Sequence, residues 1–275
     1  MPATAATQHD PATYLLVSAA VMTAVFACLW VSRRYGHERA RWPRAVLAVV
    51  GLPVVFSALC WLLPHVHPEP YEFTWLAVDR ALFGMDLAAR FRDLPGWLVE
   101  LLQLDYAAFY GFCIGSGLLA RVHSGCAAFD RAVLLLVGGF LSSYLGYLLF
   151  PTISPQLVLQ PTDELRGIAM TPALRGMIDG AEMNHWDCFP SGHTMLTLTS
   201  LIILWRWARR WFWWLLAPAA ALVASTMLLR YHWASDVVVG ALWAWPCARL
   251  CDWLATRDGW PRADQRSVMR SPRGR

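Results

Sequence analysis

The chain contains several apolar runs that each reach the length of a membrane span. About 20 consecutive apolar residues are needed for a helix to cross the hydrocarbon core of a bilayer. Only 15% of the 275 residues are charged and 57% are hydrophobic, which excludes an ordinary soluble protein because its surface needs more charge. Hydropathy predicts seven transmembrane helices, at 14–32, 44–63, 97–120, 131–150, 191–208, 212–229 and 234–254. The predicted fold is therefore all-α, a polytopic membrane helix bundle.

The distribution of basic residues predicts the orientation of these helices. All 23 basic residues are arginine, and if the seven helices alternate in direction, 17 of the arginines fall on one side of the membrane. By the positive-inside rule that side is cytoplasmic, so the N-terminus lies outside, the C-terminus lies in the cytoplasm, and the long loops 64–96 and 151–190 face outward. The first helix is expected to remain as an anchor, because residues 1–13 contain no Lys or Arg to begin a signal peptide.

The composition predicts one integral-membrane domain, residues 1–254, followed by an Arg-rich flexible cytoplasmic tail, residues 255–275. The net charge of +4 does not indicate a nucleic-acid partner, since the arginines lie in short loops and in the tail. Five of the seven cysteines lie in apolar spans, so no disulfide framework is predicted.

Two polar clusters interrupt the apolar pattern, Phe189 to Thr194 and Arg230 to Asp236. The first opens the fifth predicted helix, and the second opens the seventh. Two spans and a tight turn separate the clusters, so both return to the same outward side of the membrane. His193 and His232 are therefore predicted to face one outer pocket.

Three residues of these clusters suit the binding of a phosphate. Ser191 and Gly192 begin a helix, where unpaired N–H groups and the positive end of the helix dipole form an anion site. Arg230 can neutralise phosphoryl oxygens. The clusters therefore indicate a phosphate ligand.

The remaining polar residues suit nucleophilic chemistry on phosphorus. His232 and Asp236 are spaced i, i+4, so on a helix the carboxylate can hold one imidazole nitrogen and leave the other as the nucleophile. His193 is then placed to protonate the leaving oxygen. Taken singly, each residue can be a polar side chain bonded to lipid headgroups. Together they favour an enzyme, because ionisable groups at the membrane are costly without a role.

The segments Pro190 to His193 and Arg230 to Asp236 resemble the last two signature motifs of the type-2 phosphatidic acid phosphatase superfamily. The resemblance implies a six-helix core, metal-independent catalysis without a cofactor, and a phosphohistidine intermediate. It implies that His232 is the nucleophile and His193 the general acid. It also implies an orienting role for Asp236 and phosphate contacts from Arg230, Ser191 and Gly192.

Two further segments, Asp79 to Gly84 and Phe150 to Pro155, resemble the inositolphosphotransferase branch, the yeast-type inositol phosphorylceramide synthases. The segment Ser191 to Leu198 also resembles sphingomyelin synthases. The superfamily's first motif, a Lys followed seven residues later by Arg-Pro, is absent because the chain has no Lys. The transferase branch also lacks a clear version of that motif, which favours this branch. Arg166 and Arg175 are the candidates for the second cationic clamp.

The sequence therefore predicts an enzyme that cleaves a phosphoester of a membrane lipid at the outer leaflet and passes the phosphoryl group to water or to a lipid-alcohol acceptor. A transporter or scaffold that binds a phospholipid headgroup is the alternative. A vanadate haloperoxidase is disfavoured, because those related enzymes are not built of membrane spans. A zinc site can be drawn from four neighbouring residues, but no metal is predicted because no spaced Cys pair or His-Glu-x-x-His accompanies them. The four residues are His185, Asp187, Cys188 and His193.

Overall fold

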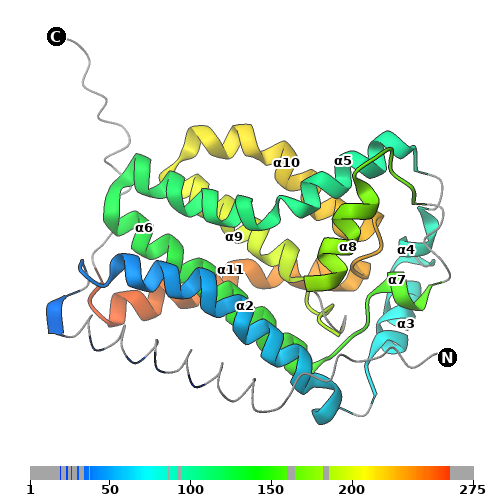
Figure 1. Ribbon diagram of the computed structural model, residues 1–275, viewed down its shortest axis with the longest axis horizontal. Helices are drawn as coiled ribbons and strands as arrows, with labels where there is room; N and C mark the ends of the chain where they lie inside the picture. Colours follow the sequence, from blue (N-terminus) through cyan, green and yellow to red (C-terminus); the bar gives the residue numbers. More distant parts are fainter. Residues whose placement is uncertain are drawn as a thin grey trace, which may run out of the picture.

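The computed structural model is a helical bundle (Figure 1) and describes residues 38–67, 69–85, 87–91, 94–159, 165–181 and 186–260, with seven positions between 19 and 36. Every regular element within these ranges is a helix, and a single isolated β-bridge joins Thr152 to Asp187. The predicted all-α bundle is confirmed. Most of the predicted first helix, 14–32, and residues 261–275 of the predicted tail lie outside the described residues.

Four of the described helices, α2, α6, α10 and α11, are long and apolar enough to cross a membrane. The central helix α9 has 16 residues, which gives it a length of about 24 Å. The chain is therefore a multi-pass membrane protein. In chain order the helices are α2 (Arg41–Val66), α3 (Glu72–Phe83), α4 (Leu87–Arg90), α5 (Gly96–Ala107), α6 (Phe109–Leu149), α7 (Pro155–Val158), α8 (Thr171–Ala181), α9 (Gly192–Trp207), α10 (Arg209–Leu228) and α11 (Ala234–Arg257).

The region predicted as two helices, 97–120 and 131–150, is built differently. Helix α5 ends at Ala107, and α6 is helical on both sides of Gly125, including most of the predicted loop between the two spans. Gly125 has φ 81° and ψ −167°, and the ribbon of α6 doubles back at one end of the bundle (Figure 1). A positive φ costs glycine little because it has no Cβ. One residue therefore reverses the chain where a longer loop was expected, and α6 consists of two arms, 109–124 and 126–149.

Helix α9 forms the centre of the bundle, where it packs against α6, α10 and α11 (Figure 1). Its apolar side chains Met195, Leu196 and Ile203 are fully buried, and so are the hydroxyl-bearing side chains of Thr197 and Ser200. Lipid tails are as apolar as leucine, so close van der Waals packing supplies much of the attraction between such helices. The central position of α9 holds its first turn inside the protein.

The two ends of the bundle differ in their chemistry. At the end predicted to be cytoplasmic, ion pairs join Arg41 to Asp130 at 3.0 Å and Arg206 to Asp252 at 2.8 Å. At the opposite end the short helices α3, α4, α7 and α8 gather near the starts of α9 and α11 (Figure 1). Helix α3 begins at Glu72 and carries Asp79 in its interior as a buried side chain.

Candidate active site

The two predicted motifs meet where α9 and α11 begin. Ser191 is the N-cap of α9, and its hydroxyl accepts a hydrogen bond from the N–H of Thr194 at 3.3 Å. The N–H of Ser191 donates to the main-chain oxygen of Asp236 in α11 at 3.1 Å. A Cβ on Gly240 of α11 would lie 2.6 Å from the main-chain oxygen of Ser191, so this close approach requires glycine. Gly192, the first residue of α9, is buried beside this junction.

Arg230 ends α10 in a conformation that usually belongs to glycine. Its φ is 65°, its N–H donates to Met227 O at 3.0 Å, and the next N–H, of Tyr231, donates to Thr226 O at 2.9 Å. This pair of bonds is the Schellman motif, whose left-handed position normally holds glycine or asparagine. A left-handed conformation costs an L-residue roughly 1–2 kcal/mol, and such strain tends to be kept at functional sites. Arg230 is also buried, with 2% of its surface exposed.

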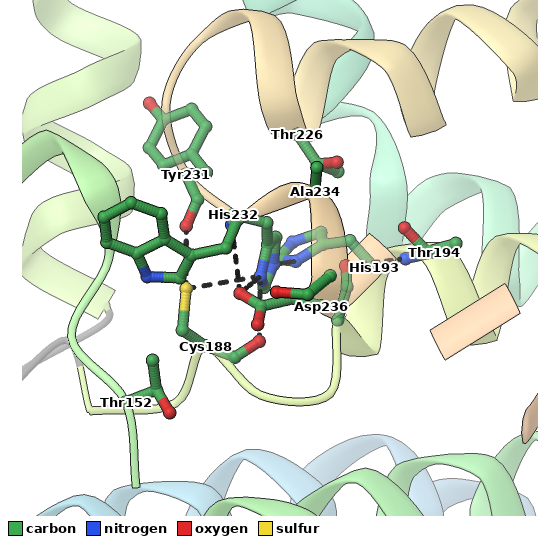
Figure 2. A network of polar contacts seen from close by, with 12 residues as sticks. Thr152, Cys188, His193, Thr194, Thr226, Tyr231, His232, Ala234 and Asp236 are labelled. Atoms are coloured by element: carbon green, nitrogen blue, oxygen red, sulfur yellow. Dashed lines mark hydrogen bonds and ion pairs between the residues drawn. The ribbon is translucent and has the colours of Figure 1, made fainter. Parts of the chain in front are cut away.

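The ring of His232 is held by a main-chain carbonyl. Its Nδ1 lies 2.9 Å from the oxygen of Cys188 and 3.6 Å from Oδ2 of Asp236 (Figure 2). A carbonyl oxygen only accepts hydrogen bonds, so Nδ1 carries a proton, and in the neutral ring Nε2 carries the lone pair. Nε2 lies 3.5 Å from Nδ1 of His193. The structure therefore brings together the two histidines that the sequence singled out.

The expected relation between His232 and Asp236 needs a correction. α11 begins at Ala234 and Trp233 is its N-cap, so His232 lies before the helix rather than on it. The shorter contact of His232 Nδ1 is with Cys188 O, and Asp236 Oδ2 accepts the N–H of Trp233 at 3.0 Å. Asp236 is thus a cap of α11 that also lies within ion-pair distance of His232.

Asp79 of α3 also binds the start of α11. Its two carboxylate oxygens accept the N–H groups of Ala234 at 2.9 Å and Ser235 at 2.8 Å, and its side chain is fully buried. Negative charge at a helix N-terminus is favourable, because the dipole and the unpaired N–H groups both attract it. The sequence indicated this residue only through the resemblance of the segment 79–84.

The loop that carries Cys188 is fixed against the segment after α6. Thr152 N–H donates to Trp186 O at 3.1 Å, and Cys188 N–H donates to Thr152 O at 3.2 Å. The indole N–H of Trp233 donates to Ile153 O at 3.0 Å. These bonds hold the Cys188 carbonyl in place beside His232.

The two candidates for a second clamp lie in different surroundings. Arg175 of α8 donates from Nε to Gln103 Oε1 at 3.4 Å, and its guanidinium lies 5.9 Å from the ring centre of Tyr231. Its Nη2 is buried without a hydrogen-bond partner among the described residues. Arg166 precedes α8 and is exposed. Arg175, the neighbour of the motif residue Tyr231, is therefore the better placed of the two.

Three side chains of the site have the atoms of a metal ligand set. The ligand atoms of Cys188, His232 and Asp236 lie within 4.8 Å of one another. Metals bind the thiolate, but burial raises the pKa of the Cys188 thiol well above its ordinary value, and Sγ contacts Tyr231 O at 3.1 Å as a donor. Hydrogen bonds of these three residues to main-chain groups account for their closeness. His185, a member of the zinc set considered from the sequence, lies outside the described residues.

Comparisons with known proteins point to one superfamily. Residues 132–260, which include both histidine motifs, match the family model described as the PAP2 superfamily. The chain is 36% identical over 84 residues to phosphatidylglycerophosphatase B of Escherichia coli (strain K12), a stretch that covers 27% of this chain and 33% of that protein. The proteins of the same name from Escherichia coli O157:H7 and Shigella flexneri match equally. The alignment thus spans about a third of the length of these curated relatives. No solved structure matches. The family model and the curated relatives both support the PAP2 superfamily for this region.

Proposed function

We propose that this protein is an integral-membrane lipid phosphatase that acts through a phosphohistidine on His232 at the outer face of the membrane. The observation that carries the proposal is the double contact of His232. Its Nδ1 bonds to the Cys188 carbonyl, and its Nε2 faces His193. A histidine held in this way presents the lone pair of Nε2 to an incoming phosphorus atom.

In the first step, Nε2 of His232 attacks phosphorus, and the bond from phosphorus to the leaving oxygen breaks. The leaving oxygen takes a proton from His193 and departs as an alcohol. Arg230 and the N–H groups at the start of α9 neutralise the phosphoryl oxygens. Arg175 provides the second cation that the missing Lys motif supplies elsewhere in the superfamily.

In the second step, water attacks phosphorus and the bond from phosphorus to nitrogen breaks. His193 takes the proton of the water, inorganic phosphate leaves, and His232 returns to its neutral state. One histidine must be neutral while the other is protonated, so the rate is expected to follow a bell-shaped pH profile. A lipid alcohol in place of water would take up the phosphoryl group and give phosphoryl transfer instead of hydrolysis.

Hydrolysis is favoured over transfer by two observations. The curated relatives carry the name of a phosphatase of a lipid phosphate. The two segments that resemble the inositolphosphotransferase branch also have structural roles that do not involve a second lipid. Asp79 caps α11, and Thr152 anchors the loop of Cys188. We therefore place transfer within that branch second.

The test is an assay of the purified protein in liposomes with a panel of lipid phosphates, lipid pyrophosphates and phospholipids, with and without ceramide or another lipid alcohol. We expect phosphate release that does not depend on the alcohol, and a loss on the order of 10³-fold or more in His232→Ala. His123→Ala is the matched control, because this ring binds the indole N–H of Trp211 at 2.9 Å, away from the site.

Three outcomes of this assay contradict the proposal in different ways. A product that forms only with the alcohol identifies a transferase. Substantial activity in His232→Ala excludes the phosphohistidine. Binding of the lipids by folded protein without turnover of any of them leaves a transporter or scaffold that binds headgroups.

A further inference from the structure

The ring of His193 contacts two aromatic rings that come from outside the region matched by the superfamily. Its centroid is 4.4 Å from that of Tyr106, with the planes 26° apart, and 4.3 Å from that of Phe109, with the planes 47° apart. Tyr106 is near the end of α5 and Phe109 begins α6, and each is only 3% exposed. Two buried rings thus restrict the plane of the imidazole.

The hydroxyl of Tyr106 also reaches a nitrogen of this ring. It lies 3.4 Å from Nδ1 of His193, the same nitrogen that lies 3.5 Å from Nε2 of His232. Nδ1 carries at most one proton, so it can donate to only one of these two partners at a time. A phosphoryl group on His232 occupies Nε2 and ends its contact with His193. The Tyr106 hydroxyl is then the partner that remains for Nδ1.

Tyr106 is itself supported from its other face. Its ring stacks on that of Tyr231 with centroids 4.2 Å apart and planes 17° apart. The Tyr231 hydroxyl exchanges hydrogen bonds with the side chain of Gln103, at 3.0 Å and 3.2 Å. Gln103 is fully buried. The stack therefore joins the general acid to the motif residue beside the nucleophile.

We propose that Tyr106 is a positioning residue for the general acid. Its ring sets the plane of His193, and its hydroxyl oxygen accepts the Nδ1–H of the protonated imidazole. The proton on Nε2 is then the one that passes to the leaving oxygen as the bond to phosphorus breaks. His232 and Tyr106 are titratable groups in contact with His193, and Tyr231 and Arg175 lie beyond Tyr106. This inference rests on the function proposed above.

The test uses two substrates with different leaving groups. The alcohol of a lipid phosphate leaves poorly and needs a proton, whereas p-nitrophenolate leaves readily and needs little help. We expect Tyr106→Phe to lower kcat on the lipid phosphate about tenfold with KM changed by less than about twofold, as loss of one hydrogen bond to a charged group implies. The same variant is expected to stay within about twofold of wild type on p-nitrophenyl phosphate.

Two further variants complete the design. Tyr106→Ala removes the ring as well and is expected to lower kcat on the lipid phosphate about a hundredfold. Tyr110→Phe is the matched control, because it removes a hydroxyl from a neighbouring tyrosine that is 55% exposed and stacks on Phe140. It is expected to match wild type on both substrates.

The outcomes separate this inference from the proposed function. Wild type without activity on either substrate contradicts the proposed function. Wild type active and His232→Ala inactive, with Tyr106→Phe equal to wild type on the lipid phosphate, overturns the role of Tyr106. Equal losses on both substrates also overturn it, because they indicate a general disturbance of the site. If Tyr106→Ala fails to fold, Tyr106→Phe decides alone, since it keeps the stacked ring.

Discussion

The Nδ1 atom of His232 lies 2.9 Å from the main-chain oxygen of Cys188, although the two residues are 44 positions apart in the chain. This contact fixes the tautomer of His232 without the help of a side chain. Asp236, at 3.6 Å from the same atom, caps α11, and in the proposed mechanism it stabilises charge on the ring.

Asp236→Asn is expected to lower kcat only about 10- to 100-fold, whereas a carboxylate that alone sets the tautomer of a catalytic histidine is worth about 10⁴-fold. The amide oxygen of asparagine can still accept the Trp233 N–H. Asp236→Ala leaves that buried N–H without its acceptor, which costs about 1–3 kcal/mol of stability. Steady-state kinetics and thermal melting in detergent measure the two effects. A loss of 10⁴-fold in Asp236→Asn would show that Asp236 and not Cys188 orients the ring.

Cys188→Ala is expected to keep activity within about fivefold of wild type, because the group that orients His232 is a carbonyl and the lost thiol hydrogen bond is weak. EDTA is expected to have no effect on the rate. Burial keeps the thiol pKa high, so Cys188 remains protonated at neutral pH and is a poor zinc ligand there. Inactivation by EDTA that zinc reverses, together with loss of activity in Cys188→Ala, would establish a metal site.

Two substitutions of Arg230 distinguish the cost of its left-handed backbone from the contribution of its cation. Arg230→Gly and Arg230→Ala both remove the cation, so each is expected to lower kcat/KM at least about a hundredfold. Glycine relieves the left-handed backbone and alanine does not, so Arg230→Gly is expected to be about 1 kcal/mol more stable than Arg230→Ala. The comparison is made from melting temperatures in the same detergent. Equal melting temperatures would mean that the conformation at φ 65° stores no strain.

Arg175→Gln is expected to raise KM for the lipid phosphate about 10- to 100-fold, because a hydrogen bond to a charged group contributes about 1.5–3 kcal/mol. Arg166→Gln serves as the control and is expected to change KM by less than about twofold, because a solvent-exposed charge contributes little. The reverse pattern in the two KM values would assign the second clamp to Arg166.

Reporter fusions test the orientation predicted from the arginines. A reporter fused after Arg210 or at the C-terminus is expected to lie in the cytoplasm, and one inserted near Asp163 is expected to lie outside. Asp163 is among the residues that the structure does not describe. If the fusions show the opposite sides, the substrate binds at the inner leaflet.

The sequence by itself determined the class of fold, most helix positions and the two motifs. Hydropathy is a local property, and the predicted spans at 44–63, 191–208, 212–229 and 234–254 correspond to α2, α9, α10 and α11. The predicted loop between 120 and 131 was wrong, because one left-handed glycine, Gly125, replaces it within a continuous helical assignment. Hydropathy contains no information on such a dihedral angle.

Only the tertiary structure decided which groups surround the two histidines. The Cys188 carbonyl, the Asp79 carboxylate and the Tyr106 ring reach the site from three separate segments. A main-chain carbonyl has no residue type, and an aspartate or tyrosine in an apolar region has no local pattern that marks its partner. Their positions depend on how α3, α5 and the loop before α9 pack around the starts of α9 and α11, and that packing is a property of the whole bundle.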